Sequence, residues 1–190
     1  MLDLETTPSE TNHQDHSATQ HILSSWVYGE AYTSTQSLRP VYHAITGQLI
    51  YEVSSHGIDT QQIVHYAKQK GRAMANLTFH QRANALKNIA QYLMERKEDY
   101  YQLAYATGVT RKDAWIDIEG GIGTLFAYSS LVRRELSDEK IWVEDAWLPL
   151  SKQGNFGAKQ IVPPKAGVAV HTNAFPFPIW EKKKKIAPSL

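Results

Sequence analysis

The sequence predicts a mixed α/β fold in which short strands come first, helices follow, and a strand–turn–helix unit closes the 190 residues. Three patterns predict it. Residues 21–54 are rich in β-branched and aromatic side chains broken by a glycine turn, which is typical of short antiparallel strands. Apolar residues then recur at helical spacing between residues 59 and 134, and an apolar run at 167–171 enters a proline-rich turn.

Composition excludes several classes of function. Lysine plus arginine number 20 and aspartate plus glutamate 19, so the net charge of +1 argues against a nucleic-acid-binding protein. No cysteine is present, which excludes a disulfide framework, a thiolate zinc site and a cysteine nucleophile within this sequence. No window approaches 18 consecutive apolar residues, so we expect no transmembrane helix and no membrane partner.

Residues 1–20 predict a disordered leader, because they are polar and follow neither the helical nor the strand period. His13 and His16 have a spacing that metal ligands use, but a solvated tail is the favoured interpretation. The leader contains no lysine, arginine or apolar stretch, so it does not have the pattern of a secretory signal. We therefore expect a soluble, cytoplasmic protein.

Short antiparallel strands are expected over residues 21–54. Thr46 and Gly47 form a turn signal that separates the apolar stretches 41–44 and 49–53. Pro40 opens this second hairpin, where its missing N–H costs little.

Helices are expected from residue 59 onward. The first runs to about Ala75, with Gly71 as its weak point and an apolar face made of Ile63, Tyr66, Ala67, Ala73 and Met74. Thr78 and Gln81 form a capping box that begins a long helix, or two in series, ending at Gly108. The apolar stripe of this part is assigned to the core and consists of Leu86, Ile89, Ala90, Leu93 and Met94.

A further helix is expected from Thr110 to about Arg134. Three glycines, Gly120, Gly121 and Gly123, would cost it about 2–3 kcal/mol of helix propensity, which indicates a close packing approach. They are not a phosphate-binding loop, because the G-x-G-x-x-G pattern is incomplete and no strand precedes it. Asp113 and Asp117 lie one turn apart; salt-bridged surface carboxylates are favoured there over metal ligands.

The last part of the chain predicts loops, two strands and the start of a helix. A loop-rich crossing over 135–157 leads to a strand over 158–162, and Pro163 and Pro164 end that strand. The apolar run 167–171 is expected to be a parallel strand, which a turn over 173–178 connects to the helix. Ligands of open α/β sheets lie beyond the carboxyl ends of such strands.

Several stretches of the sequence resemble a known family. The stretches LTFHQRANALKNIAQYL, DIEGGIGTLF, PKAGVAVHTNAFPFP and IAPSL resemble the amino-terminal part of aldehyde dehydrogenases. DIEGGIGTLF is typical of one subgroup, the PaaZ-type bifunctional aldehyde dehydrogenase/enoyl-CoA hydratases of bacterial phenylacetate degradation. The resemblance covers residues 22–190.

The resemblance implies an organisation and an activity. It divides the chain into a leader (1–20), an N-terminal aldehyde dehydrogenase segment with the start of an oligomerisation arm (21–165), and the first βα unit of a truncated, Rossmann-like nucleotide-binding domain (166–190). The intact relatives form homo-oligomers. They oxidise a ring-opened, CoA-linked semialdehyde with NADP, using a cysteine nucleophile, a glutamate base and an asparagine that stabilises the oxyanion.

The sequence departs from the family pattern at the catalytic positions. The cysteine and the glutamate have no counterpart here, and the oxyanion asparagine of N-A-F-N-F-P is replaced by Pro176, which has neither a side-chain amide nor an N–H. No catalytic or metal-binding residue is therefore assigned. The stretch that borders the cofactor in the family corresponds to Thr172, Asn173, Ala174 and Phe175. We expect a truncated chain without dehydrogenase activity of its own.

Two alternatives remain open. Instead of a dehydrogenase segment, the chain could be a non-catalytic module that docks onto an intact dehydrogenase through its arm, or a nonfunctional remnant. The four lysines over 182–185 are expected to place charge on a helix face that should be buried. This destabilises the fold unless their ammonium groups reach water.

Overall fold

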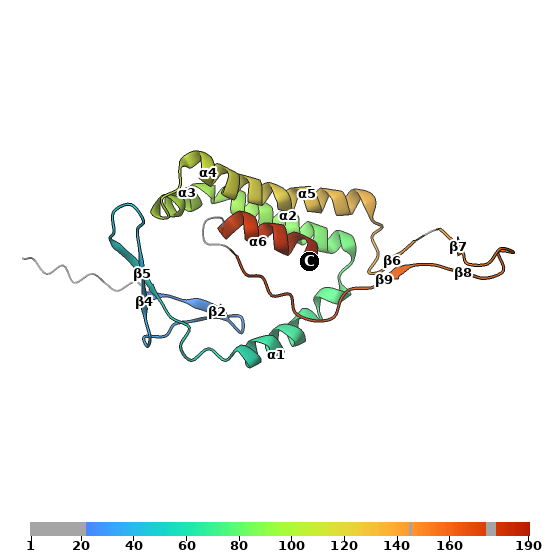
Figure 1. Cartoon of the computed structure of the whole chain (residues 1–190), viewed down its shortest axis with the longest axis horizontal. Helices are drawn as coiled ribbons and strands as arrows, with labels where there is room; N and C mark the ends of the chain where they lie inside the picture. The colour runs from blue at the N-terminus through green and yellow to red at the C-terminus, as the bar shows by residue number, and fades with distance from the viewer. Residues whose placement is uncertain (1–21, 145, 174–177) are drawn as a thin grey trace, which may run out of the picture.

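The structure, a computed structural model, describes residues 22–144, 146–173 and 178–190 (Figure 1). It confirms the predicted mixed α/β fold, with strands first and a layer of packed helices after them. The predicted leader, His13, His16 and Pro176 lie outside the described residues. Within the described part, none of the helices is both long enough and apolar enough to cross a bilayer.

The N-terminal strands form a small sheet and a separate hairpin. Strands β4 (Arg39–Tyr42) and β5 (Leu49–Val53) pair antiparallel around the predicted turn at Gly47, whose φ is +71°. β1 (Ile22–Leu23) adds to the other edge of β5 in parallel, which the sequence did not predict. β2 (Ser25–Val27) and β3 (Glu30–Tyr32) form the second, antiparallel pair.

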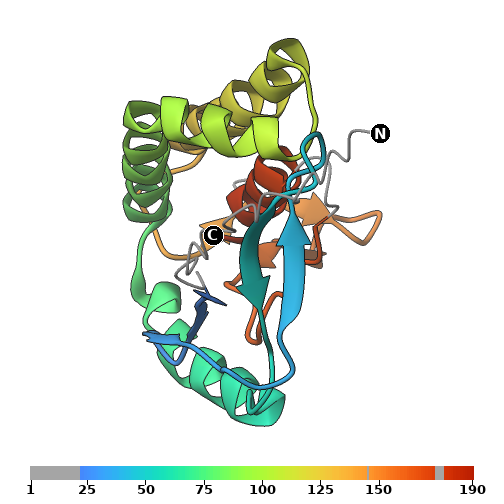
Figure 2. The same cartoon turned by 90° about the vertical axis from the view of Figure 1, so that its left-hand side faces the viewer.

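The β4–β5 hairpin is fixed to the helices at its tip. Figure 2 shows this tip beside the end of α3, where the Ala44 N–H donates to the Ala106 carbonyl over 2.8 Å. Pro40 lies in β4, an edge strand of the sheet, where a missing N–H is tolerated as predicted.

The first helix is shorter than predicted. α1 (Thr60–Gly71) begins at the Asp59 cap and ends at Gly71, the predicted weak point, and a 3₁₀ turn, η1 (Met74–Asn76), follows. The predicted apolar face does not form a core, because α1 buries none of its residues fully. One aromatic contact links α1 to the β2–β3 hairpin: the ring of Tyr66 meets that of Tyr28 edge-on, with ring centroids 6.0 Å apart.

The next two helices follow the prediction closely. α2 (Phe79–Glu95) begins with the Thr78–Gln81 capping box, and α3 (Lys97–Ala106) continues after a break at Arg96. Most of the predicted stripe faces the core, but Ile89 is 40% exposed and does not.

One nearly continuous helical segment covers residues 111–135. It consists of α4 (Arg111–Trp115), a π-helical turn η2 (Ile116–Gly120) and α5 (Gly121–Glu135). Residues from all three pack against α2, α3 and the C-terminal turn. The resulting core cluster contains Leu86, Ala90, Tyr101, Ala114, Ile118, Ile122, Leu125 and Ala187.

A two-stranded ribbon extends away from the helices (Figure 1). β6 (Trp142–Val143) pairs with β9 (Ile161–Val162), and β7 (Leu148–Pro149) pairs with β8 (Gly157–Ala158). The predicted strand over 158–162 is therefore two short strands, because the pairing is interrupted between β8 and β9. We call residues 142–162 the arm; many of its apolar side chains are exposed.

The predicted βα unit is only half formed. Residues 167–171 are not a strand, because no strand in the described ranges lies beside them to complete a ladder, and Val170 is 82% exposed. The helix is present as α6 (Pro178–Ile186), followed by the 3₁₀ turn η3 (Ala187–Ser189). α6 packs against α5 and η2 (Figure 1).

Candidate functional site

The start of α6 is held by a buried carboxylate on η2. Asp117 accepts hydrogen bonds from the backbone N–H groups of Trp180 (2.7 Å) and Ile179 (3.4 Å). These are first-turn donors that have no partner within their own helix. The prediction of a salt-bridged surface pair is wrong for Asp117, because it is only 6% exposed and caps a helix.

In the described part of the chain, no group of three potential metal ligands converges. Burial raises the pKa of Asp117 above its ordinary value of 3.8, and the two N–H donors oppose the shift without cancelling it. The carboxylate therefore has a structural function at this junction.

Two of the three glycines make room for Trp180, which confirms the predicted close approach. A Cβ atom at Gly120 would lie 2.5 Å from Cζ3 of the Trp180 ring. At Gly121 it would lie 2.9 Å from Cα of Trp180, so here the backbones themselves meet. The prediction is wrong for Gly123, where a Cβ atom would have nothing within 4 Å of it.

The stretch predicted to border the cofactor leads directly into this junction. Thr172 and Asn173 are exposed, while Ala174 and Phe175 lie outside the described residues. The ammonium of Lys185 donates to the Thr172 carbonyl, so the described half of the stretch is fixed to α6. A contact of 3.4 Å between Ser189 Oγ and His171 Nε2 adds a second link.

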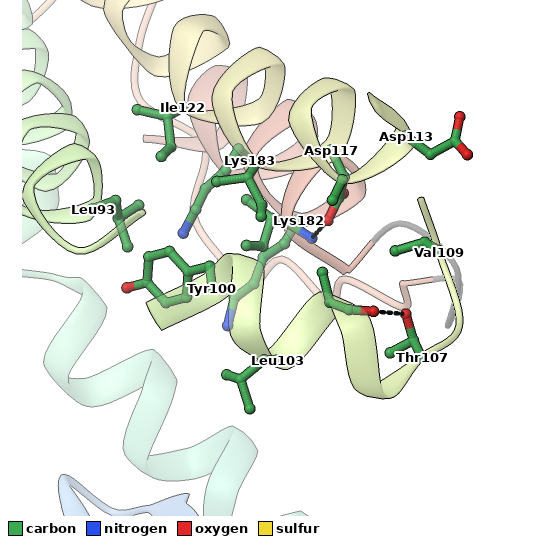
Figure 3. Close-up of a pocket in the computed structure, with 14 residues that line it drawn as sticks. Leu93, Tyr100, Leu103, Thr107, Val109, Asp113, Asp117, Ile122, Lys182 and Lys183 are labelled. Carbon is green, nitrogen blue, oxygen red and sulfur yellow. Dashed lines mark hydrogen bonds between the residues drawn. The ribbon is translucent and has the colours of Figure 1, made fainter. Parts of the chain in front are cut away.

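The four lysines of α6 divide into two pairs. Lys184 and Lys185 form ion pairs with Glu181, at 3.3 and 2.9 Å. Lys182 and Lys183 extend instead into a cavity of about 340 Å³ beside α3 (Figure 3). Lys182 is exposed and Lys183 half-buried, so water relieves only part of the predicted cost of burying lysine charges on this helix.

The cavity is a feature that the sequence did not predict. Residues of α2, α3, α4, η2, α5 and α6 line it, and apolar side chains form most of its wall. The only feature of the sequence that hinted at this cavity is the pair of adjacent lysines, Lys182 and Lys183, on a helix otherwise expected to be buried. Apolar pockets with a few polar groups are the usual form of small-molecule sites.

A partly buried polar cluster fixes α3 to η2 on another side of the core. Glu119 accepts hydrogen bonds from Lys97 Nζ and from the Tyr101 hydroxyl, both at 3.0 Å. The Lys97 ammonium lowers the pKa of Glu119, and burial together with Glu119 raises the pKa of Tyr101 to about 12. The cluster links the π turn to the start of α3.

The chain therefore combines a mixed α/β fold, an extended two-stranded arm and a C-terminal helix, α6, whose first turn is capped by Asp117. The profile of the aldehyde dehydrogenase family matches residues 30–190. The chain belongs to the aldehyde dehydrogenase family, which confirms the resemblance at that level.

Two curated relatives are similar to the chain. The 3,4-dehydroadipyl-CoA semialdehyde dehydrogenase of Aromatoleum evansii is 31% identical over 170 residues, which cover 88% of this chain and 33% of the relative. The lactaldehyde dehydrogenase of Methanocaldococcus jannaschii is 29% identical over 133 residues, which cover 70% of this chain and 26% of the relative. The chain thus spans about a third of the first relative and a quarter of the second.

Proposed function

We propose that these residues form the N-terminal segment of a cytoplasmic, NADP-dependent dehydrogenase that oxidises a CoA-linked semialdehyde in phenylacetate catabolism. The family match over 30–190 supports aldehyde oxidation, and the identity of 31% to a CoA-linked semialdehyde dehydrogenase supports the substrate class. In this proposal residues 21–165 are the N-terminal segment and arm, and 166–190 begin the nucleotide-binding domain.

The residues that border the cofactor in this proposal are Thr172, Asn173, Ala174 and Phe175. The exposure of Thr172 and Asn173 supports it, because both side chains are accessible to a ligand. The Lys185 contact engages the Thr172 carbonyl and fixes the backbone before any ligand binds. When bound, the nicotinamide accepts the hydride from the substrate.

The substrate class is testable on the protein expressed from its complete reading frame. We expect reduction of NADP, and slower reduction of NAD, with a CoA-linked semialdehyde. Lactaldehyde is the comparison substrate, since the second relative is named for it. Faster turnover of lactaldehyde than of the CoA-linked substrate would overturn the proposed substrate class.

These 190 residues by themselves are proposed to be inactive, because family chemistry needs a thiolate and the sequence contains no cysteine. Pro176 also replaces the oxyanion asparagine. The purified 190-residue polypeptide should give no steady NADPH formation from an aldehyde. Continuous NADPH formation by this polypeptide would contradict the proposal.

A second candidate is a docking module that binds an intact aldehyde dehydrogenase subunit through the arm. The exposed apolar side chains of the arm favour it, and they include Trp142, Trp147, Leu148 and Ile161. Unpaired strand edges are natural sites for adding a strand from another chain. Co-purification with a full-length family member is expected, and elution as separate species would exclude this function.

A further inference from the structure

We propose that the side-chain amine of Lys183 captures apolar aldehydes as a reversible imine in the cavity between α3 and α6. The residues that line this cavity do not include Thr172 or Asn173, and the proposed chemistry requires no cysteine. The inference rests on the proposed function only for the choice of an aldehyde as the ligand.

The cavity has the size and lining of a small-molecule site. Its volume of about 340 Å³ suits a short aliphatic chain rather than a whole coenzyme A ester. Leu93, Leu103 and Ile122 contribute to its apolar wall, and Figure 3 shows Lys182 and Lys183 extending from α6 into the same space. An aldehyde would place its carbon chain on this wall and its carbonyl near an amine.

Most other polar groups of the cavity already have partners. The Thr107 hydroxyl donates to the Ala104 carbonyl, Asp113 accepts from the Thr110 hydroxyl, and Asp117 is occupied by the first turn of α6. Among the residues that the structure describes, no carboxylate lies within ion-pair distance of Lys182 or Lys183. Among the described residues, the two lysines and the Tyr100 hydroxyl are therefore the polar groups of the cavity left to meet a ligand.

The surroundings of Lys183 favour its neutral, nucleophilic form. Burial lowers the pKa of Lys183 below the ordinary 10.5, and the adjacent Lys182 charge lowers it further. The other titratable groups that line the cavity are Tyr100, Asp113 and Asp117. A desolvated lysine beside a second cation is a known way to prepare an amine for attack on a carbonyl.

The reaction needs no oxidant or reductant. The Nζ lone pair forms a bond to the carbonyl carbon, and the two protons of the amine pass to the carbonyl oxygen through solvent. That oxygen then leaves as water while the C=N bond forms. Hydrolysis reverses each step, so the aldehyde is held but not consumed.

The test is reductive trapping on the purified protein without any nicotinamide cofactor. Hexanal and cyanoborohydride are added at neutral pH, and the alkylated lysines are identified by peptide mass spectrometry. We expect several-fold faster labelling of Lys183 than of Lys112, an exposed lysine on α4. The labelling rate of Lys183 should reach half its maximum at a lower pH than that of Lys112. With acetaldehyde, which has almost no apolar chain, the ratio of Lys183 to Lys112 labelling should be much smaller.

Variants separate the role of the amine from that of the fold. Lys183→Arg keeps the positive charge and should abolish the preferred label, with the helical circular dichroism unchanged. Lys182→Met removes the neighbouring charge and should slow labelling of Lys183, whereas Lys112→Arg should leave it unchanged. Labelling that simply follows exposure, with Lys182 ahead of Lys183, would overturn the inference.

The two proposals fail in different ways. Because trapping requires neither NADP nor a cysteine, loss of dehydrogenase activity leaves this result unaffected. Equal labelling of all lysines by hexanal overturns the imine site even if the whole protein oxidises a CoA-linked semialdehyde.

Discussion

The carboxylate of Asp117 accepts the backbone N–H of Trp180 over 2.7 Å, although the two residues are 63 positions apart. Asp117 is directed inward by the π turn, and the next turn of the same helix carries the two glycines that admit Trp180. The segment 117–121 therefore both caps α6 and receives its first turn. In this way the start of α6, which follows the stretch predicted to border the cofactor, is attached to the helical layer.

Removing the Asp117 carboxylate should weaken this attachment. Asp117→Ala leaves two partly buried N–H groups without this acceptor, so we expect a loss of about 1–2 kcal/mol in the free energy of unfolding. Asp117→Asn keeps one acceptor oxygen and should lose less. Urea denaturation measures both, and equal stability of the alanine variant and the wild type would show that the cap contributes nothing.

The glycines of the same helix give a matched pair of substitutions. Gly121→Ala places a methyl group 2.9 Å from Trp180 Cα, which is backbone and cannot rotate away. We expect destabilisation of about 1–3 kcal/mol as α6 is displaced. Gly123→Ala meets nothing within 4 Å and should instead stabilise the helix by up to about 1 kcal/mol.

Thermal unfolding followed by circular dichroism distinguishes these two glycine variants. A higher midpoint for Gly123→Ala and a lower one for Gly121→Ala is the expected order. The reverse order would mean that α6 does not pack on the glycines in solution.

Local sequence signals predicted the helices well because each depends on near neighbours. The Thr78–Gln81 box and the end of α1 at Gly71 are both of this kind. The function of Asp117 was not predictable, since its partner is 63 residues away and the π turn that directs it inward has no signature in the sequence.

Contacts distant in sequence also explain the wrong strand at 167–171. An apolar run becomes a strand only when another strand completes its hydrogen bonds, and none of the described residues does so. The cavity was missed for a related reason, because six separate elements are needed to enclose it. The stretch 172–175 stays a prediction that rests on the resemblance.

The proposed function of the arm predicts a change in association without a change in stability. Ile161 is 59% exposed on β9, so Ile161→Lys should alter the free energy of unfolding by no more than about 0.5 kcal/mol. It should nevertheless weaken self-association or docking through the arm. Ile45→Lys, at a 70% exposed position in the β4–β5 turn, is the control that should leave association unchanged.

Sedimentation velocity over a range of concentrations measures this effect. A shift of only the Ile161 variant toward the monomer supports the arm as the interface. Identical sedimentation of both variants and the wild type would exclude a contribution of Ile161 to assembly.

The Glu119 cluster predicts how stability depends on pH. The Lys97 ammonium lowers the folded-state pKa of Glu119 below its ordinary 4.5, so its ionised form stabilises the fold above that pH. This contribution is lost as the pH falls through the lowered pKa. Glu119→Gln should cost about 1 kcal/mol at neutral pH, and the difference from wild type should shrink in acid. The pH dependence of the Asp117 contribution has the opposite sign. Burial raises the folded-state pKa of Asp117, so its contribution to the free energy of unfolding falls as the pH rises above 3.8. Urea denaturation of the wild type and of Glu119→Gln across the acid range measures the difference in their free energies of unfolding. A difference that widens on acidification would contradict a stabilising function of ionised Glu119.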